Sequence, residues 1–324
     1  MEAVQYLERY KAPTASRSLE ISEDYYKRFI DYLDCKPKTV TTYTGALKQF
    51  AEYLKAHRIT RPEREDIKAY REELESSGKK ANTIYAYIFI VRRFFEWTAD
   101  EGIYPNVAGK IKGAKISKQH KKEALADRQV EDLLANIDRS TVIGKRDYAI
   151  IYTMLTCGLR EIEITRANIK DMQSTGGGTI LHVQGKGHDD ADDTVNLPED
   201  TETVIKEYLE ARGATDPEEP LFTSNSNHNA GGRLNPCSVS RLCKQHLKGI
   251  GIDNERYTAH SFRHTAVTFA LLENNGNIQA TAQFARHANI ETTLIYAHNL
   301  EARKNTCSRQ IANRIAQYTR TTQL

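Results

Sequence analysis

The chain has 324 residues, of which 39% are hydrophobic and 27% charged, and its formal net charge is +3. This length suffices for two domains with separate cores, and the composition is typical of soluble globular protein. No apolar run approaches the roughly 20 residues that a membrane-spanning helix needs, and residues 1–10 lack the apolar core of a signal peptide. The mild net charge permits nucleic-acid binding without arguing for it.

The cysteines are odd in number and lack the pairing of metal sites. We therefore expect reduced thiols in a cytoplasmic protein. The residues concerned are Cys35, Cys157, Cys237, Cys243 and Cys307.

The first hundred residues predict a short arm followed by a helical domain. Residues 1–21 are poorly patterned, so we expect a short N-terminal arm there. Residues 22–104 carry apolar side chains every three or four positions, which indicates helices, the first around Tyr25 to Leu33. We expect Thr39 to cap the second helix and Asn82 or Thr83 to cap the fourth. The apolar stripes are Val40, Tyr43, Leu47, Phe50 and Leu54, then Ile67, Tyr70 and Leu74, then Ile84, Ile88, Val91, Phe94, Phe95 and Trp97.

Residues 105–123 form the clearest linker. Pro105 interrupts the helical pattern, and lysines recur among glycines, a composition typical of an extended connection. The second domain begins at residue 124, where we expect Asp127 to cap a helix. A buried helix over 147–156 then ends at Gly158.

The second domain is predicted to be helical with a small sheet. Residues 179–183 and 194–197 have the pattern of a β-hairpin, preceded by a glycine turn over 176–178. Lys186 lies on the loop between the two strands. Further helices are expected over 201–210, 238–249 and 260–273.

The stretch from Ala259 to His298 concentrates the chemistry. His260 and Arg263 are three residues apart, so they share one face of a helix. His287 lies on a turn between two helical runs, and Tyr296 follows on a helix opened by Asn289. A cation, two imidazoles and a phenol that converge could hold a phosphodiester and attack it with the phenol oxygen.

This row resembles the signature of the tyrosine recombinases, the phage-integrase-type site-specific DNA recombinases. Two upstream runs complete the pattern: Thr156-Cys157-Gly158-Leu159-Arg160 and Gly185-Lys186-Gly187. Order and spacing fit from about residue 22 to 300. The resemblance implies a mostly α-helical protein, with an N-terminal four-helix core-DNA-binding domain over 22–104. It also implies an α-rich catalytic domain over 124–324, with a small antiparallel β-sheet and a C-terminal tail helix.

The resemblance also assigns the chemistry. Arg160 and Arg263 would grip the phosphate, and His260 and His287 would donate hydrogen bonds to it. Lys186 would protonate the leaving 5′-oxygen, and Tyr296 would form a 3′-phosphotyrosine. The bond energy is conserved in that intermediate, so no metal or other cofactor is expected. Glu163 could orient Arg160 from the same helical face, with a purely structural ion pair as the alternative.

The implied partners are double-stranded DNA and further copies of the chain. We expect a homo-tetramer on two DNA sites, with room for accessory DNA-bending proteins. The tail carries an apolar stripe at Leu300, Cys307, Ile311, Ile315 and Tyr318, which either docks into a neighbouring protomer or packs on its own domain. DNA contacts are expected from the basic residues beside the helices and in the linker, although a solvated surface explains them equally: Lys79, Lys80, Lys110, Lys112, Lys115 and Lys118.

Two departures from the family pattern stand out. The hairpin continues with the acidic run Asp189-Asp190-Ala191-Asp192-Asp193, which would repel DNA unless it faces solvent or a partner protomer. Arg286 stands where the family usually has glycine. A left-handed helix end costs a non-glycine residue roughly 1 kcal/mol, so either the turn differs or Arg286 adds a phosphate contact.

Our sequence-based prediction is a site-specific recombinase or integrase that serves integration and excision of a mobile element. A resolvase of replicon dimers from the same family is the nearest alternative. A type IB topoisomerase-like enzyme and a non-catalytic DNA-binding module are two others. The intact set of catalytic residues argues against the last.

Overall fold

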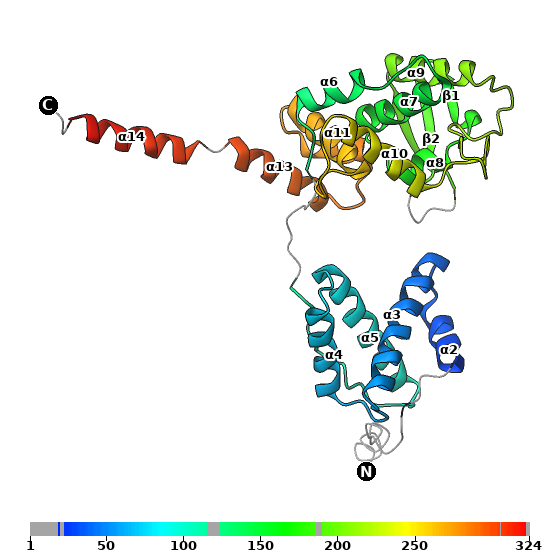
Figure 1. The fold of residues 1–324 in the computed structure, drawn as a ribbon, viewed down its shortest axis with the longest axis vertical. Coiled ribbons are helices and arrows are strands. Elements are labelled where there is room, and N and C mark those ends of the chain that lie inside the picture. The colour runs from blue at the N-terminus through cyan, green and yellow to red at the C-terminus, as the bar shows by residue number, and fades with distance from the viewer. Residues whose placement is uncertain (1–18, 20–22, 116–122, 186–189, 305, 322–324) are drawn as a thin grey trace, which may run out of the picture. The chain divides into compact units, whose positions relative to one another are not determined.

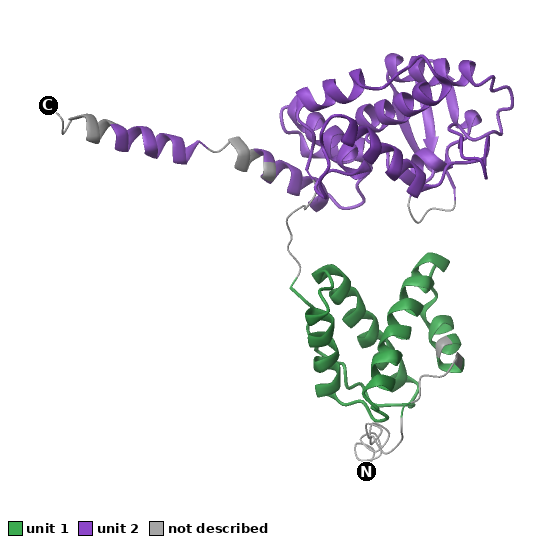
Figure 2. Ribbon diagram, in the orientation of Figure 1, with its two compact units in different colours: residues 1–118 green, residues 119–324 purple. Residues whose placement is uncertain are grey.

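The computed structural model describes residue 19 and residues 23–115, 123–185, 190–304 and 306–321. The chain divides into two compact units, residues 1–118 and 119–324 (Figure 2). In these described segments no helix is both long and apolar enough to cross a membrane. Each unit has its own buried core.

The first unit is built from helices α2 (Glu23–Leu33), α3 (Pro37–Ala56), α4 (Arg64–Ser76) and α5 (Ala81–Asp100) (Figure 1). The predicted apolar stripes face one another and make the core. Phe50 lies 5.1 Å from Tyr70 between ring centroids, and Phe29 of α2 lies 5.5 Å from Phe94 of α5. The four-helix prediction is confirmed.

Three predicted helix caps are wrong by one to three residues. Helix α3 begins at Pro37, whose missing N–H and fixed φ suit the first helical position, so Thr39 lies inside the first turn. Helix α5 is preceded by Lys80, which places Asn82 and Thr83 inside the helix. In the second unit Ala126 precedes α6, so Asp127 is its first residue. Apolar spacing locates a helix, but its first residue depends on local backbone angles.

Part of the predicted linker packs on the first unit. Ala108 and Ile111 are buried in its core. The Arg64 guanidinium donates to the carbonyl of Gly109 at 2.5 Å, and Arg71 donates to the carbonyl of Lys112 at 3.2 Å. The packed unit therefore extends past residue 104.

The second unit surrounds helix α7, which packs against α9 and α11. Helix α7 is buried through a mainly apolar run that includes Ile150, Ile151 and Met154, whereas the buried residues of α11 are apolar and polar alike. The described helices are α6 (Asp127–Ala135), α7 (Val142–Cys157), α8 (Glu161–Arg166), the short 3-10 helix η1 (Ile169–Asp171), α9 (Glu199–Ala211), α10 (Pro236–Gly249), α11 (Ala259–Glu273), α12 (Ile278–Ala285), α13 (Glu291–Lys304) and α14 (Cys307–Thr321).

A three-stranded antiparallel sheet in the order β1-β2-β3 completes this unit. Strands β2 (Gly178–Val183) and β3 (Asp193–Leu197) are the predicted hairpin. Strand β1 (Met172–Thr175) was not predicted, because its side chains are largely exposed and give no apolar alternation. The glycine turn joins it to β2 through the pair Thr175 and Gly178.

Candidate active site

Gly158 starts the site at the C-terminal end of α7. Its φ of 60° and ψ of 30° are left-handed, the conformation that ends many helices and that glycine adopts without steric cost. The turn sends the chain into Arg160, which is extended at φ −83° and ψ 154° and immediately precedes α8. The carbonyl of Gly158 remains free of the helix and accepts hydrogen bonds from arginines.

Arg160 is held by Glu163. The Nη1 of Arg160 donates to Oε1 at 2.6 Å, and its backbone N–H donates to Oε2 at 2.9 Å. The carboxylate is fully buried, whereas the Arg160 side chain is 29% exposed. A buried anion thus fixes a cation that still reaches the surface, which agrees with the predicted pair.

Arg263 reaches the same place from α11 and is buried. Its Nη1 donates to the carbonyl of Gly158 at 2.5 Å, and its Nη2 donates to the carbonyl of Ala285. Burial lowers the pKa of Arg263 to about 9, with Arg160 acting in the same direction and Glu163 opposing it. The guanidinium is still charged at pH 7.

Tyr296 lies on α13 and is buried with the rings of two histidines beside it. Its ring centroid is 5.0 Å from that of His264 and 6.1 Å from that of His287. Burial raises the pKa of the Tyr296 phenol to about 12, although Arg263 and Arg160 pull it down. The phenol therefore carries its proton at neutral pH and sits within the electrostatic reach of both arginines.

His287 lies between α12 and α13 as predicted, and its Nδ1 is 2.8 Å from the hydroxyl of Thr293, a fully buried residue. His260 is exposed in the first turn of α11, with its ring 4.6 Å from that of His264. His264 is buried. Two of the three histidines, His264 and His287, are thus ring neighbours of Tyr296, and the third, His260, is a neighbour of His264.

Arg286 has the left-handed conformation, with φ 51° and ψ 49° at the C-terminal end of α12. The sequence left two explanations for an arginine in place of glycine, a different turn or an added phosphate contact. The turn keeps the left-handed conformation, so the first explanation is wrong. The side chain turns inward, where Nη2 donates to Oε2 of Glu163 at 2.9 Å and Nη1 to the carbonyl of Phe284 at 3.0 Å. Its buried Nε has no partner among the described residues.

The guanidiniums of Arg160 and Arg286 therefore share one carboxylate, and Arg263 interacts with it electrostatically. Burial alone would raise the pKa of Glu163, but Arg286 and Arg160 outweigh it and hold that pKa below its usual range. The cluster keeps a positive excess next to a phenol. Such a site can bind a phosphodiester and stabilise the charge that develops when the phenol attacks.

Lys186 lies outside the described residues, together with His188 and Asp189. Its neighbour Gly185 is described, and the carbonyl of Gly185 accepts from Nη1 of Arg166 at 2.8 Å. This bond anchors the end of β2 to α8, the helix that follows Arg160. Beyond the gap, Asp190 and Asp192 are exposed.

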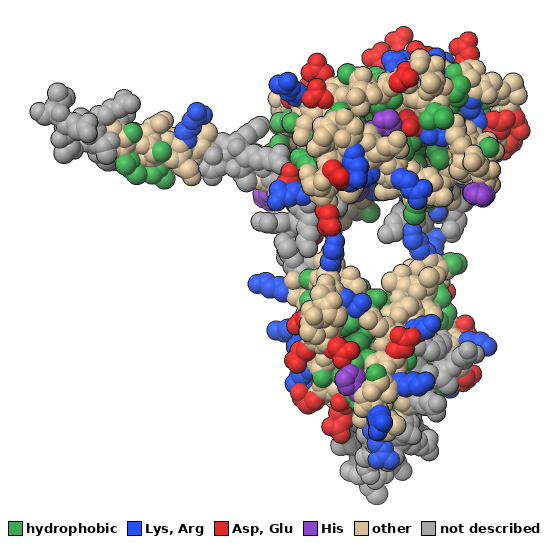
Figure 3. Space-filling view, in the orientation of Figure 1, with side chains coloured by type: hydrophobic (Ala, Val, Ile, Leu, Met, Phe, Trp, Pro, Cys, Tyr) green, Lys and Arg blue, Asp and Glu red, His purple; other side chains and the backbone are tan. Residues whose placement is uncertain are grey.

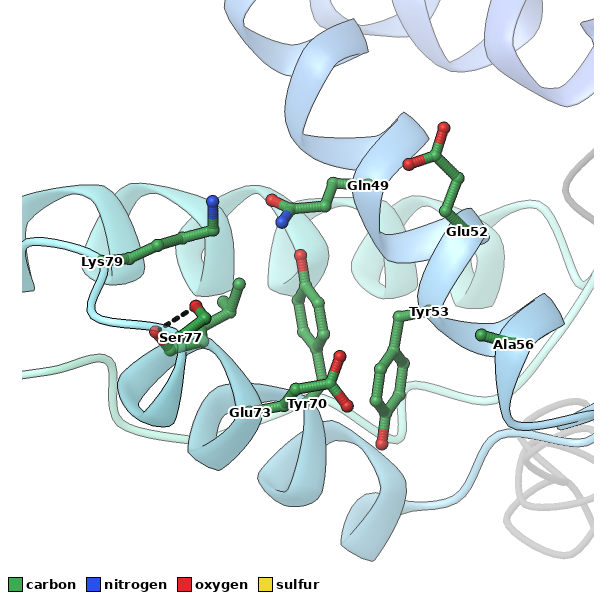
Figure 4. A pocket seen from close by; sticks show the side chains of 9 residues that line it. Gln49, Glu52, Tyr53, Ala56, Tyr70, Glu73, Ser77 and Lys79 are labelled. Carbon is green, nitrogen blue, oxygen red and sulfur yellow. Dashed lines mark hydrogen bonds between the residues drawn. The ribbon is translucent and has the colours of Figure 1, made fainter.

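The lysines expected to contact DNA belong to the first unit. Lys79 lines a pocket of about 350 Å³ with Gln49 and the Tyr70 hydroxyl (Figure 4), and its Nζ lies 5.8 Å from the Tyr87 ring centroid. Lys80 is exposed just before α5. Lys110, Lys112 and Lys115 are exposed as well, while Lys118 lies outside the described residues.

Sequence reasoning did not find the roles of Thr293 and of the Gly158 carbonyl. The sequence alone does not show that the hydroxyl of a helical threonine contacts a histidine. Thr293 follows His287 by six residues, and this spacing allows the contact where the chain enters α13. Backbone carbonyls leave no trace in a sequence. The sequence indicated the turn at Gly158, but not the hydrogen bonds that its carbonyl accepts.

The sequence matches two protein-family models. Residues 123–303 match the phage integrase family, and residues 26–102 match the phage integrase N-terminal SAM-like domain. The tyrosine recombinase XerC of Alcanivorax borkumensis is 30% identical over 241 residues, which cover 72% of this chain and 74% of that protein. The tyrosine recombinase XerD of Listeria monocytogenes is 29% identical over 288 residues, covering 86% and 94%.

Solved structures share the fold. The XerH site-specific recombinase bound to its difH substrate, in a pre-cleavage complex, matches with a TM-score of 0.65 at 20% identity, covering 82% of this chain and 79% of that one. A lambda integrase dimer bound to a COC′ core site matches with a TM-score of 0.68 at 17% identity, covering 85% and 94%. At these identities the likeness concerns the fold alone.

Proposed function

Because the chain belongs to the phage integrase family and is a tyrosine recombinase, an enzyme that breaks and rejoins DNA strands, we propose that Tyr296 is its nucleophile. The observation that carries this proposal is the placement of one buried phenol under the joint influence of Arg160 and Arg263. Attack of the phenol oxygen on phosphorus forms the phosphotyrosine, releases the 5′-oxygen and requires that the phenol lose its proton.

The remaining residues take the roles that the charges favour. Arg160 and Arg263 hold the non-bridging oxygens as charge develops on them, and His260 and His287 donate hydrogen bonds at the same phosphate. Lys186 protonates the leaving oxygen. Glu163 orients Arg160. The reaction exchanges one phosphate ester for another, so the energy of the broken bond is retained in the phosphotyrosine.

The test is the covalent adduct. Tyr296→Phe keeps the buried ring and removes only the nucleophilic oxygen, so DNA binding should remain while the adduct on a denaturing gel disappears. Tyr257→Phe is the matched control, because the Tyr257 hydroxyl donates to Glu123 at 3.1 Å in the same unit. A normal adduct yield in Tyr296→Phe would refute the assignment.

The biological role that we propose is integration and excision of a mobile element. A second role, the resolution of replicon dimers, is favoured by the curated relatives, because those at 29% and 30% identity bear Xer names. A strain that lacks the gene distinguishes the two. Loss of the excised circular junction supports the first role, and accumulation of replicon multimers supports the second. Relaxation of plasmid DNA without a specific site would instead indicate a topoisomerase-like activity.

The partners that we propose are double-stranded DNA, contacted by the exposed lysines of the first unit, and further copies of the chain in a tetramer. Helix α14 supports the second partner. Ile311 and Ile315 are 59% and 54% exposed, and hydrophobic side chains gather on one side of that helix (Figure 3). An apolar stripe that does not pack on its own unit can pack on a neighbour.

Removal of residues 303–324 tests the tetramer. The shortened protein should bind a single half-site, while it loses cooperative binding to a full site and loses recombination. In the full-length chain, Ile311→Ser with Ile315→Ser should have the same effect, whereas Arg309→Ser, which leaves the stripe intact, should not. Cooperative filling of both half-sites by the shortened protein would place the interface elsewhere.

A further inference from the structure

The backbone conformation and the burial at position 286 are both unfavourable for an arginine. Its φ of 51° is in the left-handed region, which favours glycine, and its buried Nε–H lacks a partner among the described residues. Two unfavourable features at one residue that contacts Glu163 and Arg160 call for a compensating role, since strained residues persist where the surroundings make use of them.

The Arg286 guanidinium is directed at Glu163 and is little exposed. The side chain is only 9% exposed, and its terminal nitrogens already donate to Phe284 and to Glu163. Arg160, by contrast, is 29% exposed; its Nη1 donates to Glu163, and its Nη2 makes a longer bond of 3.4 Å to the carbonyl of Arg286. Arg160 is therefore the more accessible of the two guanidiniums to a phosphate.

Glu163 is the residue that joins the two arginines. Its Oε1 accepts from Arg160, and its Oε2 accepts from Arg286 and from the backbone of Arg160. A buried carboxylate paired with a single guanidinium cancels much of that cation's charge. A carboxylate shared by two guanidiniums neutralises only one of their two positive charges. The field of the remaining charge is strengthened by burial.

We propose, on the basis of the function proposed above, that Arg286 is a positioning residue that neutralises the negative charge of Glu163. Arg160 then retains its positive charge for the scissile phosphate. The backbone contributes as well, because the carbonyl of Arg286 accepts from Nη2 of Arg160 at 3.4 Å. Arg286 acts through Glu163 and Arg160 and does not touch the DNA.

The experiment measures the single-turnover rate of adduct formation on a nicked duplex. This duplex carries the site that the wild-type protein selects from random-sequence DNA. Arg286→Met removes the charge and keeps an apolar stem, so we expect a slowdown of roughly tenfold or more with little change in DNA affinity. Arg286→Lys retains the charge and should recover most of the rate. Arg139→Met, which breaks an ion pair with Glu207, is the control for loss of one arginine.

Arg286→Gly separates the proposed role from a merely structural one. Glycine relieves the left-handed backbone strain, so this variant should keep its thermal stability better than Arg286→Met does. We nevertheless expect both variants to be equally slow. A rate that follows stability across the two variants would overturn the proposal.

A double-mutant cycle with Glu163→Gln tests the mechanism itself. If Arg286 acts by neutralising Glu163, removal of that negative charge makes the arginine dispensable, and the double variant should be slowed less than the product of the two single effects. Multiplying effects would mean that Arg286 acts independently of Glu163 and would overturn the inference. Absence of any wild-type adduct would instead overturn the function proposed for Tyr296.

Discussion

Gly158→Ala would perturb the point from which the site is built. At φ 60° an alanine costs roughly 1–2 kcal/mol of folding stability relative to a right-handed conformation. The new Cβ would also lie 3.2 and 3.3 Å from Cε1 and Cζ of Phe284, closer than ordinary van der Waals contact. Overpacking of this kind typically adds about 1–3 kcal/mol. We therefore expect a marked loss of stability in this variant.

Gly213→Ala provides the matched control in the same unit. Its φ is 69°, and an added Cβ would meet nothing within 4 Å, so it carries the backbone cost without the ring contact. The gain from a less flexible unfolded chain is common to both variants and cancels in the comparison. Thermal unfolding followed by circular dichroism should show Gly158→Ala melting at least about 2 °C below Gly213→Ala.

The same variant should reduce activity beyond its effect on stability. The acceptor that fixes Nη1 of Arg263 is the Gly158 carbonyl, which shifts if the backbone yields to the clash with Phe284. Adduct formation by Gly158→Ala, measured well below its melting temperature, should therefore be slower than that of Gly213→Ala. Equal melting temperatures for the two variants would show that the Phe284 ring yields without cost. Full activity in Gly158→Ala would refute the link to Arg263.

Two further predictions concern proton positions. Thr293→Val keeps the buried volume but removes the hydroxyl that lies 2.8 Å from Nδ1 of His287, so adduct formation should slow by roughly tenfold. Thr293→Ser keeps a hydroxyl and should retain the rate. Equal slowing in both variants would show that the hydroxyl does not orient the His287 ring. Lys186→Ala should slow cleavage of an ordinary substrate by about 100-fold or more, but should hardly affect one with a 5′-bridging sulfur, because a thiolate leaves without a proton; equal slowing on both substrates would remove Lys186 from the role of acid.

The helical architecture could be predicted because it follows from apolar spacing. The stripes in α3, α4 and α5 and the buried run in α7 are local in sequence, and each has one compatible periodicity. Strand β1 could not be predicted, because Gln173 and Ser174 are exposed and their pairing with β2 is the only sign of a strand. The exact starts of α3 and α5 depend on single backbone angles and were missed for that reason.

The candidate site was only partly predictable for a related reason. Sequence motifs located Arg160, Arg263, His287 and Tyr296, since each lies at a fixed distance from a turn signal. They gave no direction for the side chain of Arg286. Whether that guanidinium points to solvent or inward depends on the carboxylate of Glu163, which lies 123 residues earlier in the chain and 2.9 Å away in space.

Tyr296 and the arginine cluster together explain why the site can be ready before DNA arrives. Burial raises the pKa of the phenol to about 12, so in the free protein the proposed nucleophile carries its proton at neutral pH. The guanidiniums are fixed by buried acceptors: the carbonyls of Gly158 and Ala285 for Arg263, and Glu163 for Arg160. Little reorganisation of these donors is then needed when a phosphate binds, which is the condition under which fixed charges stabilise a transition state most effectively. In the proposed mechanism, loss of the phenol proton is therefore the step that remains once the phosphate is bound.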